Sequence, residues 1–359
     1  MPVQNFKTID ANNDVTTTRT LLHEAVPLTG TIVSGTYGPA FPDEGNIKNF
    51  SHGMFQSVYD YPYLSSSANH IFDITCGFAS SSVLVTGPEN NPNMVQQSKK
   101  INMYTQYAQV LLGYTGSAVE TFASDLNYGD DNRQMKECFF INFSRLLMKD
   151  QIKPGTFSIS LGVGSAWNTA LSTVKTFTDA SASSDGTGTK NTNGGDYAVL
   201  YSGSSEAGNG GAGLIFYQAG IVVLSSSCFS RATLVDFYKN QAGARYPVSG
   251  SLVSASISGN CDAIRHRLHN ISFNNTTEIN STVYFCRVPF NSNNYSSNPT
   301  YLSGSKIRVK SVGTDMPISY ITTVGLYNAS DELVAVAKVS EPLRKDPTNE
   351  LTLRVRLDY

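Results

Sequence analysis

Cysteine and histidine residues, which are good zinc ligands, gather near position 265. Cys261, His266 and His269 are spaced so that the two histidines, three residues apart, could share one face of a helix. A fourth ligand is missing, and Arg265 and Arg267 alternate with the histidines, where their positive charges would repel a cation. We therefore predict no metal site here, but a buried thiol beside partly exposed histidines.

A glycine-rich stretch has the spacing of a nucleotide-binding loop. Residues 208–213, GNGGAG, match the pattern GxGxxG, in which glycines let a helix N-terminus approach a pyrophosphate. The flanking segments, Tyr197–Tyr201 and Leu214–Tyr217, have the composition of strands. The stretch is therefore predicted to be the loop of a β-hairpin, and we predict no bound cofactor.

Two acidic stretches, Asp10–Asp14 and Asp125–Asp130, resemble the opening of a calcium-binding loop. The twelfth position, where such a loop carries a bidentate glutamate, holds Leu21 in the first stretch and Lys136 in the second. Because Asp, Asn and Gly are also the usual residues of turns, both stretches are predicted to be surface turns without a metal.

No local signature of catalysis accompanies these residues. The GxSxG motif is absent, and five histidines offer few general bases. We predict that the protein is not an enzyme, that it has no catalytic residues and that it takes no small-molecule substrate. A carbohydrate-active enzyme stays open as a third alternative, because the two carboxylates of a glycosidase pair in space and could lie among the 28 acidic residues.

The composition argues against nucleic-acid and membrane partners. Only 15% of the 359 residues are charged, and the net charge of −2 creates no positive field to hold a phosphate backbone. No apolar run approaches the roughly 20 residues that span a bilayer, and residues 1–14 lack the pattern of a signal peptide, so we predict synthesis in a cytoplasm. A neutral polar composition of this kind suits long-lived β-rich assemblies, and also secreted adhesins and lectins.

The cysteines are five in number, widely spaced and without a CxxC pair. We therefore predict free, buried thiols in place of a disulfide framework. The five positions are Cys76, Cys138, Cys228, Cys261 and Cys286.

Apolar periodicity predicts many short strands and few helices. Ile101, Tyr104, Ala108 and Leu111 recur at spacings of three and four, which predicts a helix over 94–112; further short helices are expected in 232–240 or 253–269. The main predicted strands are 28–33, 71–76, 138–143, 157–161, 197–201, 214–224, 271–273, 282–286, 306–309, 320–326, 333–339 and 351–359.

The last of these strands has the clearest pattern in the chain. Five apolar residues alternate with Thr352, Arg354, Arg356 and Asp358, which is the two-residue period of a strand with one buried face. We predict that this face is structural and contributes to a subunit interface. The five apolar residues are Leu351, Leu353, Val355, Leu357 and Tyr359.

These elements together predict a mainly β protein with antiparallel, sandwich-like sheets and one or two short helices. We expect an extended N-terminal arm over residues 1–40, a main β-rich domain over 41–255 with glycine-rich loops at 180–213, and a C-terminal antiparallel region over 256–359. The arm could add a strand to a neighbouring subunit.

Two blocks of sequence resemble a known family. The segments 319–328 (SYITTVGLYN), 332–338 (ELVAVAK) and 351–359, with a second block over 143–161, resemble virion structural proteins of marine contractile-tailed phages, the cyanophages in particular. The blocks cover about an eighth of the chain and carry no catalytic residue.

The resemblance implies a non-enzymatic component of a virion, most readily of the tail at the baseplate or neck. Its expected partners are other virion proteins and copies of itself. A fibre that binds a host surface or polysaccharide, or a capsid decoration protein, is the alternative.

Overall fold

The computed structural model describes most of the chain, and the structural statements below concern the described residues. These are residues 7–29, 45–85, 94–115, 118–119, 121–123, 134–163, 173–182, 188–202, 211–229, 237–239, 245–296, 298–304, 306–308, 312, 314 and 316–359.

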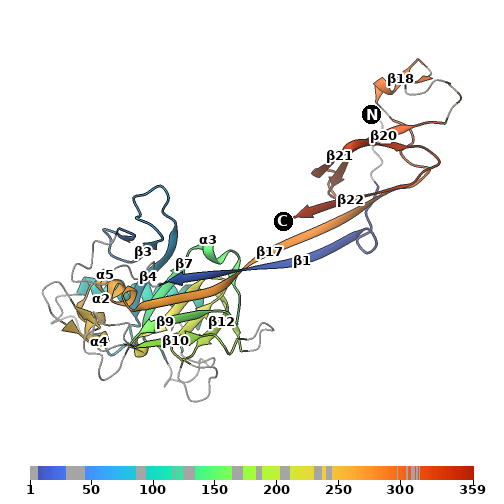
Figure 1. Ribbon diagram of the computed structural model, residues 1–359. Helices are drawn as coiled ribbons and strands as arrows, with labels where there is room; N and C mark the ends of the chain where they lie inside the picture. Colours follow the sequence, from blue (N-terminus) through green and yellow to red (C-terminus); the bar gives the residue numbers. More distant parts are fainter. Residues whose placement is uncertain are drawn as a thin grey trace. The chain divides into compact units, whose positions relative to one another are not determined.

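The chain forms two compact units. Unit 1 combines Met1–Leu21 with Glu278–Tyr359, and unit 2 is Leu22–Thr277. This division differs from the expected one, whose boundaries lie near residues 40 and 255. Within the expected arm, β1 (Val15–Thr29) is a neighbour of β17 (Leu268–Val288) of the same chain, and Figure 1 shows the two as long strands that run side by side.

The largest sheet of unit 2 has eight strands, and each neighbouring pair is antiparallel. Its central strands are apolar on both faces because both faces are covered, as in residues 138–141. In sheet order the strands are β11 (Lys190–Thr192), β12 (Gly195–Leu200), β13 (Gly213–Phe216), β14 (Ile221–Ser225), β7 (Glu137–Phe143), β4 (His70–Phe78), β3 (Gln56–Tyr59) and β2 (Ile47–Asn49).

A second antiparallel sheet packs on the first. Its order is β1, β17, β9 (Ser158–Gly162) and β10 (Val174–Thr178), and β8 (Gln151–Ile152) and β22 (Leu351–Asp358) also pair with β17. Phe139, Ile141 and Phe143 of the first sheet share one buried apolar cluster with Ile159 and Leu161 of the second, together with Leu268, Ile271 and Phe273. The predicted antiparallel, sandwich-like fold is therefore confirmed.

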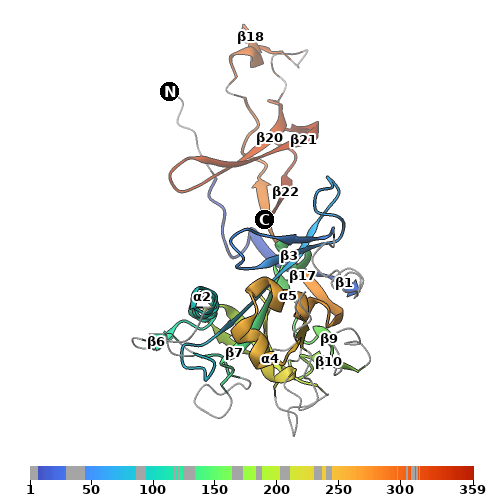
Figure 2. The same ribbon diagram turned by 90° about the vertical axis from the view of Figure 1, so that its left-hand side faces the viewer.

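The other face of the large sheet is covered by α2 (Met94–Leu111), which runs along one side of the strand layers and is seen end-on in Figure 2. Tyr104, Ala108 and Leu111 face the sheet, so the predicted helix and its buried stripe are confirmed. Gly113 follows the helix with a φ of +96°, which a glycine adopts without strain. The other α-helices described are α3 (Arg145–Met148), α4 (Val248–Ser254) and α5 (Ile257–Arg265).

Gly77 in β4 lets α2 approach the sheet backbone. A Cβ atom at this position would lie 2.5 Å from the Lys100 carbonyl oxygen and 2.8 Å from the Tyr104 nitrogen. We expect Gly77→Ala to lower the free energy of unfolding by about 1–3 kcal/mol, because backbone atoms cannot move aside as a side chain can. Urea denaturation would measure the loss, and Gly53→Ala, at a glycine with open space around it but a φ of +61°, provides a comparison in which only backbone strain acts. Equal losses in the two variants would contradict the packing explanation.

Four predicted elements differ from the structure. The strand expected over 214–224 is a hairpin, because a turn at 217–220 ending in Gly220, with a φ of +66°, separates β13 from β14. The strands expected at 271–273 and 282–286 are parts of the continuous strand β17. In the 232–240 segment, Tyr238–Lys239 form the short strand β15, paired with β16 (Arg245–Tyr246), and residues 232–236 and 240 lie outside the described residues.

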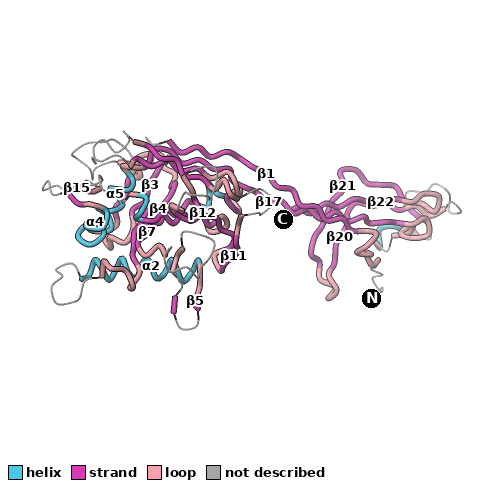
Figure 3. The backbone as a smooth tube through the Cα atoms, turned by 90° about the horizontal axis from the view of Figure 1, so that it is seen from below, coloured by secondary structure: helices cyan, strands magenta, loops and turns pink. Residues whose placement is uncertain are grey.

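Unit 1 contains the three predicted C-terminal strands. β20 (Ser319–Tyr327) and β21 (Leu333–Lys345) form a two-stranded antiparallel sheet. β22 pairs with β17 in a register that runs from Ser281 opposite Asp358 to Val288 opposite Leu351. Short pieces precede them: the 3₁₀ turn Pro299–Tyr301, β18 (Leu302–Ser303) and β19 (Lys306–Ile307). Figure 3 shows how far strands dominate this unit.

Candidate interaction surface

The residues weighed as zinc ligands do not converge. The Cys261 thiol is buried and donates to the Ile74 carbonyl at 3.2 Å, His266 Nδ1 lies 2.7 Å from the Asp262 carbonyl, and His269 is exposed on β17. Within the described part of the chain, no group of three or more His, Cys, Asp or Glu side chains could hold a metal ion. Cys261 is buried as predicted, but His266 is buried too.

Arg265, expected as a charge that repels cations, is instead the centre of a buried polar network. Its Nη2 lies 3.3 Å from Asp262 Oδ1 and its Nε donates to Gln56 Oε1 at 3.3 Å, while Gln56 Nε2 donates to Asp262 at 2.7 Å and to Asn49 at 2.9 Å. Burial raises the pKa of Asp262, although the Arg265 guanidinium beside it acts in the opposite direction. The network joins α5 to β3 and so fixes the helix on the sheet.

Asp179 is a second buried carboxylate. Its two oxygens accept hydrogen bonds from Tyr217 Oη and Gly155 N, both at 2.8 Å, and from Phe157 N at 3.0 Å. Burial raises the pKa of Asp179 despite these donors. The three hydrogen bonds hold the turn before β9 against the turn between β13 and β14. The role of Asp179 is therefore structural.

Lys100 is a buried cation on α2 whose ammonium group contacts backbone carbonyls. Its ammonium donates to the Leu252 carbonyl at 2.6 Å and to the Ala255 carbonyl at 2.5 Å. These carbonyls belong to the end of α4, where a positive charge is favourable. Burial lowers the pKa of Lys100 and raises that of the neighbouring Cys76 thiol to about 12, so this thiol is inert at neutral pH.

The remaining motifs also have structural explanations where they are described. β12 and β13 pair antiparallel, as the predicted hairpin requires, and residues 208–210 of the glycine-rich stretch lie outside the described part. Residues 11–13 form the predicted turn, in which Asp10 accepts from Asn12 N at 3.0 Å. Asp125–Asp130 lie outside the described residues. All five cysteines are free thiols, three of them buried and two half-buried.

The β20–β21 hairpin presents apolar side chains to solvent. On one face Leu326 is buried, with Val324, Ala335 and Ala337 half-buried. On the other side of the hairpin, four apolar residues are 43–66% exposed; we call them the hairpin surface: Tyr327, Leu333, Val334 and Val336. A two-stranded sheet is at best marginally stable in water, and an exposed apolar group of this kind is typical of an interaction site.

The predicted interface residues of the last strand occupy one side of the β17–β22 pair. Leu351, Leu353 and Leu357 are half-buried and Val355 is buried. Tyr359 is 73% exposed, but its backbone exchanges two hydrogen bonds with Asn280, at 2.8 and 3.0 Å. The face is therefore only partly covered within this chain.

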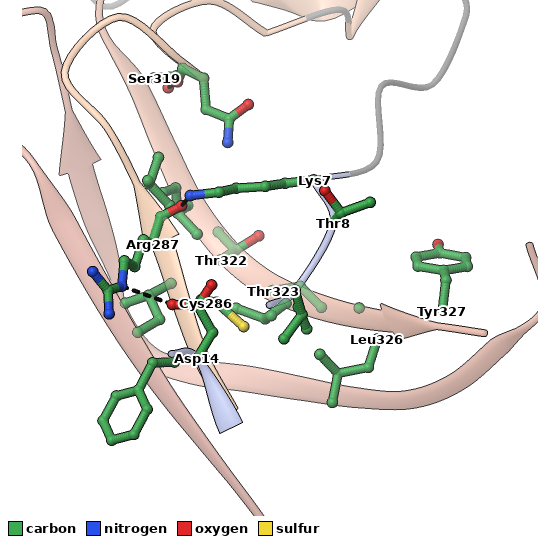
Figure 4. A pocket seen from close by; sticks show the side chains of 18 of the residues that line it. Lys7, Thr8, Asp14, Cys286, Arg287, Ser319, Thr322, Thr323, Leu326 and Tyr327 are labelled. Atoms are coloured by element: carbon green, nitrogen blue, oxygen red, sulfur yellow. Dashed lines mark hydrogen bonds and ion pairs between the residues drawn. The ribbon is translucent and has the colours of Figure 1, made fainter. Parts of the chain in front are cut away.

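A cavity of about 880 Å³ lies within unit 1, next to the hairpin (Figure 4). One wall is β20, from which every residue of 319–327 contributes to the lining, and another is the N-terminal segment Lys7–Ile9. Cys286, Val288 and Leu353 of the β17–β22 pair complete it. Lys7 Nζ reaches the Arg287 carbonyl at 2.7 Å, and Arg287 in turn lies 2.8 Å from Asp14.

No family model, curated protein or solved structure matches this chain.

Among the helices that the structure describes, none is long and apolar enough to cross a bilayer.

The sequence predicted the last strand and did not reveal the hairpin surface. The residues of the hairpin surface look like ordinary strand residues in the sequence. Alternation of apolar and polar residues predicts a strand, but it does not show which face of the strand another layer covers. One signal was present. β20 has no charged residue in nine, whereas edge strands of monomeric proteins usually carry charges or proline.

Proposed function

We propose that this protein is a non-enzymatic structural component of a virion, most readily of a phage tail at the baseplate or neck, that assembles with copies of itself and other virion proteins. The observation that carries the proposal is the hairpin surface together with the half-covered face of β22. Both leave apolar strand surface in solvent, which is costly for an isolated chain and favourable when a neighbouring subunit covers it.

The resemblance to virion proteins concerns these same strands. The segments 319–328, 332–338 and 351–359 fall on β20, β21 and β22, which are the exposed strands of unit 1. The polar networks of unit 2 supply an argument against catalysis. Asp179, Asp262 and Arg265 have shifted or buried charges, but their partners are backbone groups and buried side chains that hold elements together.

Immunogold labelling of intact particles of a contractile-tailed marine phage, with an antibody against this chain, tests the proposal. Label at the baseplate or neck supports the tail assignment. Label over the head would replace it by capsid decoration, and label at fibre tips would replace it by host binding. Absence of label on all particles, with the antibody shown to recognise the native chain, overturns the virion assignment.

Exposed aromatic residues on unit 2 favour binding of host polysaccharide as a second candidate. Tyr61 and Tyr63 are 58% and 36% exposed, and Tyr63 lies 6.2 Å from the Tyr59 ring and 6.0 Å from the Lys48 ammonium. Aromatic faces of this kind stack on sugar rings. Binding of the full chain to purified host polysaccharide, with loss of binding in Tyr63→Ala, would favour this function.

A further inference from the structure

We infer that β20 pairs with the β20 strand of a second copy of this chain, antiparallel and centred on Thr323. The inference rests on the proposed function, because it names the surface through which copies of the chain associate.

The free edge of β20 is the first observation. Among the described residues, β21 is the strand that pairs with β20, along one edge. Consecutive residues 319–327 all line the cavity, although alternate side chains of a strand point to opposite faces. The cavity therefore runs along the second edge of β20, where N–H and C=O groups can accept another strand.

The charge pattern of the three C-terminal strands is the second observation. β21 carries Lys338 and, at an irregularity of its pairing between residues 338 and 343, Pro342; β22 carries Arg354 and Arg356. Charges, proline and bulges of this kind keep an edge strand from pairing with another chain. β20 has neither charged residues nor proline, so its edge is the unprotected one of the three.

Self-pairing fits the β20 sequence. Centring the pair on Thr323 overlaps all nine residues and places Ile321 opposite Gly325, Thr322 opposite Val324, and Tyr320 opposite Leu326 of the second copy. No charged residues meet, and Ile321 lies over the position where a side chain is missing. Cross-strand pairs between aromatic or branched apolar residues stabilise a sheet.

The cavity has suitable walls for such a strand. Cys286, Val288 and Leu353 line it with apolar groups, and the cations nearby are already engaged, since Lys7 donates to the Arg287 carbonyl and Arg287 pairs with Asp14. An uncharged strand therefore suits it better than an acidic ligand. Pairing would turn two marginal two-stranded sheets into one four-stranded sheet, β21–β20–β20–β21.

Disulfide cross-linking tests the register. In an antiparallel pair centred on residue 323, the two Thr323 Cα atoms lie about 4.5–5.5 Å apart, within reach of a disulfide. We expect full-length Thr323→Cys, in a background with Cys286→Ser and Cys228→Ser, to form a covalent dimer under mild oxidation. The matched control is Val110→Cys in the same background, which is 66% exposed on α2, and we expect it to remain monomeric on a non-reducing gel.

A charge at the centre tests the pairing without a new thiol. Thr323→Glu places two carboxylates opposite each other across the two-fold axis, so we expect the dissociation constant of the dimer to rise about tenfold or more, measured by analytical ultracentrifugation. Within its own hairpin residue 323 lies opposite Lys338, which tolerates a glutamate, and Thr323→Gln provides the neutral control.

Two results would overturn the inference: a monomeric wild-type chain at every concentration tested, or a dimer in which Thr323→Cys fails to cross-link and Thr323→Glu changes nothing. The particle-labelling experiment is independent of both. Label on the virion with no β20 pairing would leave the proposed function standing and assign the association to another surface.

Discussion

Replacing Arg265 by methionine is expected to lower the free energy of unfolding by about 3–5 kcal/mol. The guanidinium is fully buried and is bound to Asp262 and Gln56, both at 3.3 Å. Methionine has a similar length but no donors, so the substitution leaves a buried carboxylate without its counter-charge. Urea denaturation followed by tryptophan fluorescence and circular dichroism would measure the loss.

The matched control is Arg356→Met in β22. Arg356 also pairs with an aspartate, Asp358 at 2.7 Å, but both side chains are about half exposed, and exposed ion pairs contribute little. We expect little or no change there. The double variant Arg265→Met with Asp262→Leu should recover part of the lost stability, because it removes the orphaned charge. Equal effects of the two single methionine variants would show that the buried network is not important for the fold.

These expectations bear on function because a buried Arg–Asp–Gln cluster can be mistaken for an active site. If Arg265→Met lowers the free energy of unfolding while the folded variant still associates as the wild type does, the cluster is a structural joint between α5 and β3. That outcome agrees with a scaffold whose interactions with other molecules take place on unit 1.

The sequence predicted best what depends on local periodicity. The alternation in 351–359 predicted β22, and the three- and four-residue spacing from Ile101 to Leu111 predicted α2, because each pattern reports which side of an element is apolar. It failed at 214–224, where both strands of the hairpin are apolar on both faces and no change of period marks the turn.

Long-range pairing was beyond the reach of the sequence. Arg265 and Arg267 were interpreted only as charges that would repel a cation, yet both are buried. The sequence does not reveal their partners, because Gln56 lies 209 residues from Arg265 and the Gly162 carbonyl lies 105 residues from Arg267. The cavity has the same origin, because its walls come from both ends of the chain. The absence of charged residues in β20 is a further example. It becomes informative only when the structure shows that β20 is an edge strand.

Replacing Asp179 by alanine is the second substitution with a large expected effect, a loss of about 3–5 kcal/mol in the free energy of unfolding. The substitution leaves three donors, Gly155 N, Phe157 N and Tyr217 Oη, without an acceptor, and each buried, unsatisfied group costs about 1–3 kcal/mol. Asp179 is 1% exposed, so water does not readily take the place of its carboxylate in the variant.

The pH dependence of Asp179 separates it from the exposed carboxylates. Burial raises its pKa in the folded state above the unfolded value, so the folded protein binds the proton more tightly. The Asp179 contribution to stability is therefore greatest below the unfolded pKa of about 3.9 and is lost as pH rises through the folded pKa. We expect the stability difference between the wild type and Asp179→Asn to grow in favour of the wild type as pH falls from 7 to about 4.

Asp60→Asn is the control with the opposite sign. Asp60 also accepts from a backbone N–H, that of Asn69 at 2.6 Å, and from the Asn69 side chain at 2.9 Å, but it lies at the surface. Its slight burial acts to raise the pKa, and the Asn69 hydrogen bonds outweigh this and lower it, so its contribution is present above the unfolded pKa and is lost as pH falls through the folded pKa. Denaturation of both variants from pH 7 to about pH 2 measures the two changes. We expect the Asp179 difference to change above the unfolded pKa of about 3.9 and the Asp60 difference to change below it, with the opposite sign. An Asp179 difference that stays constant between pH 7 and about pH 4 would mean that this carboxylate is hydrated in solution.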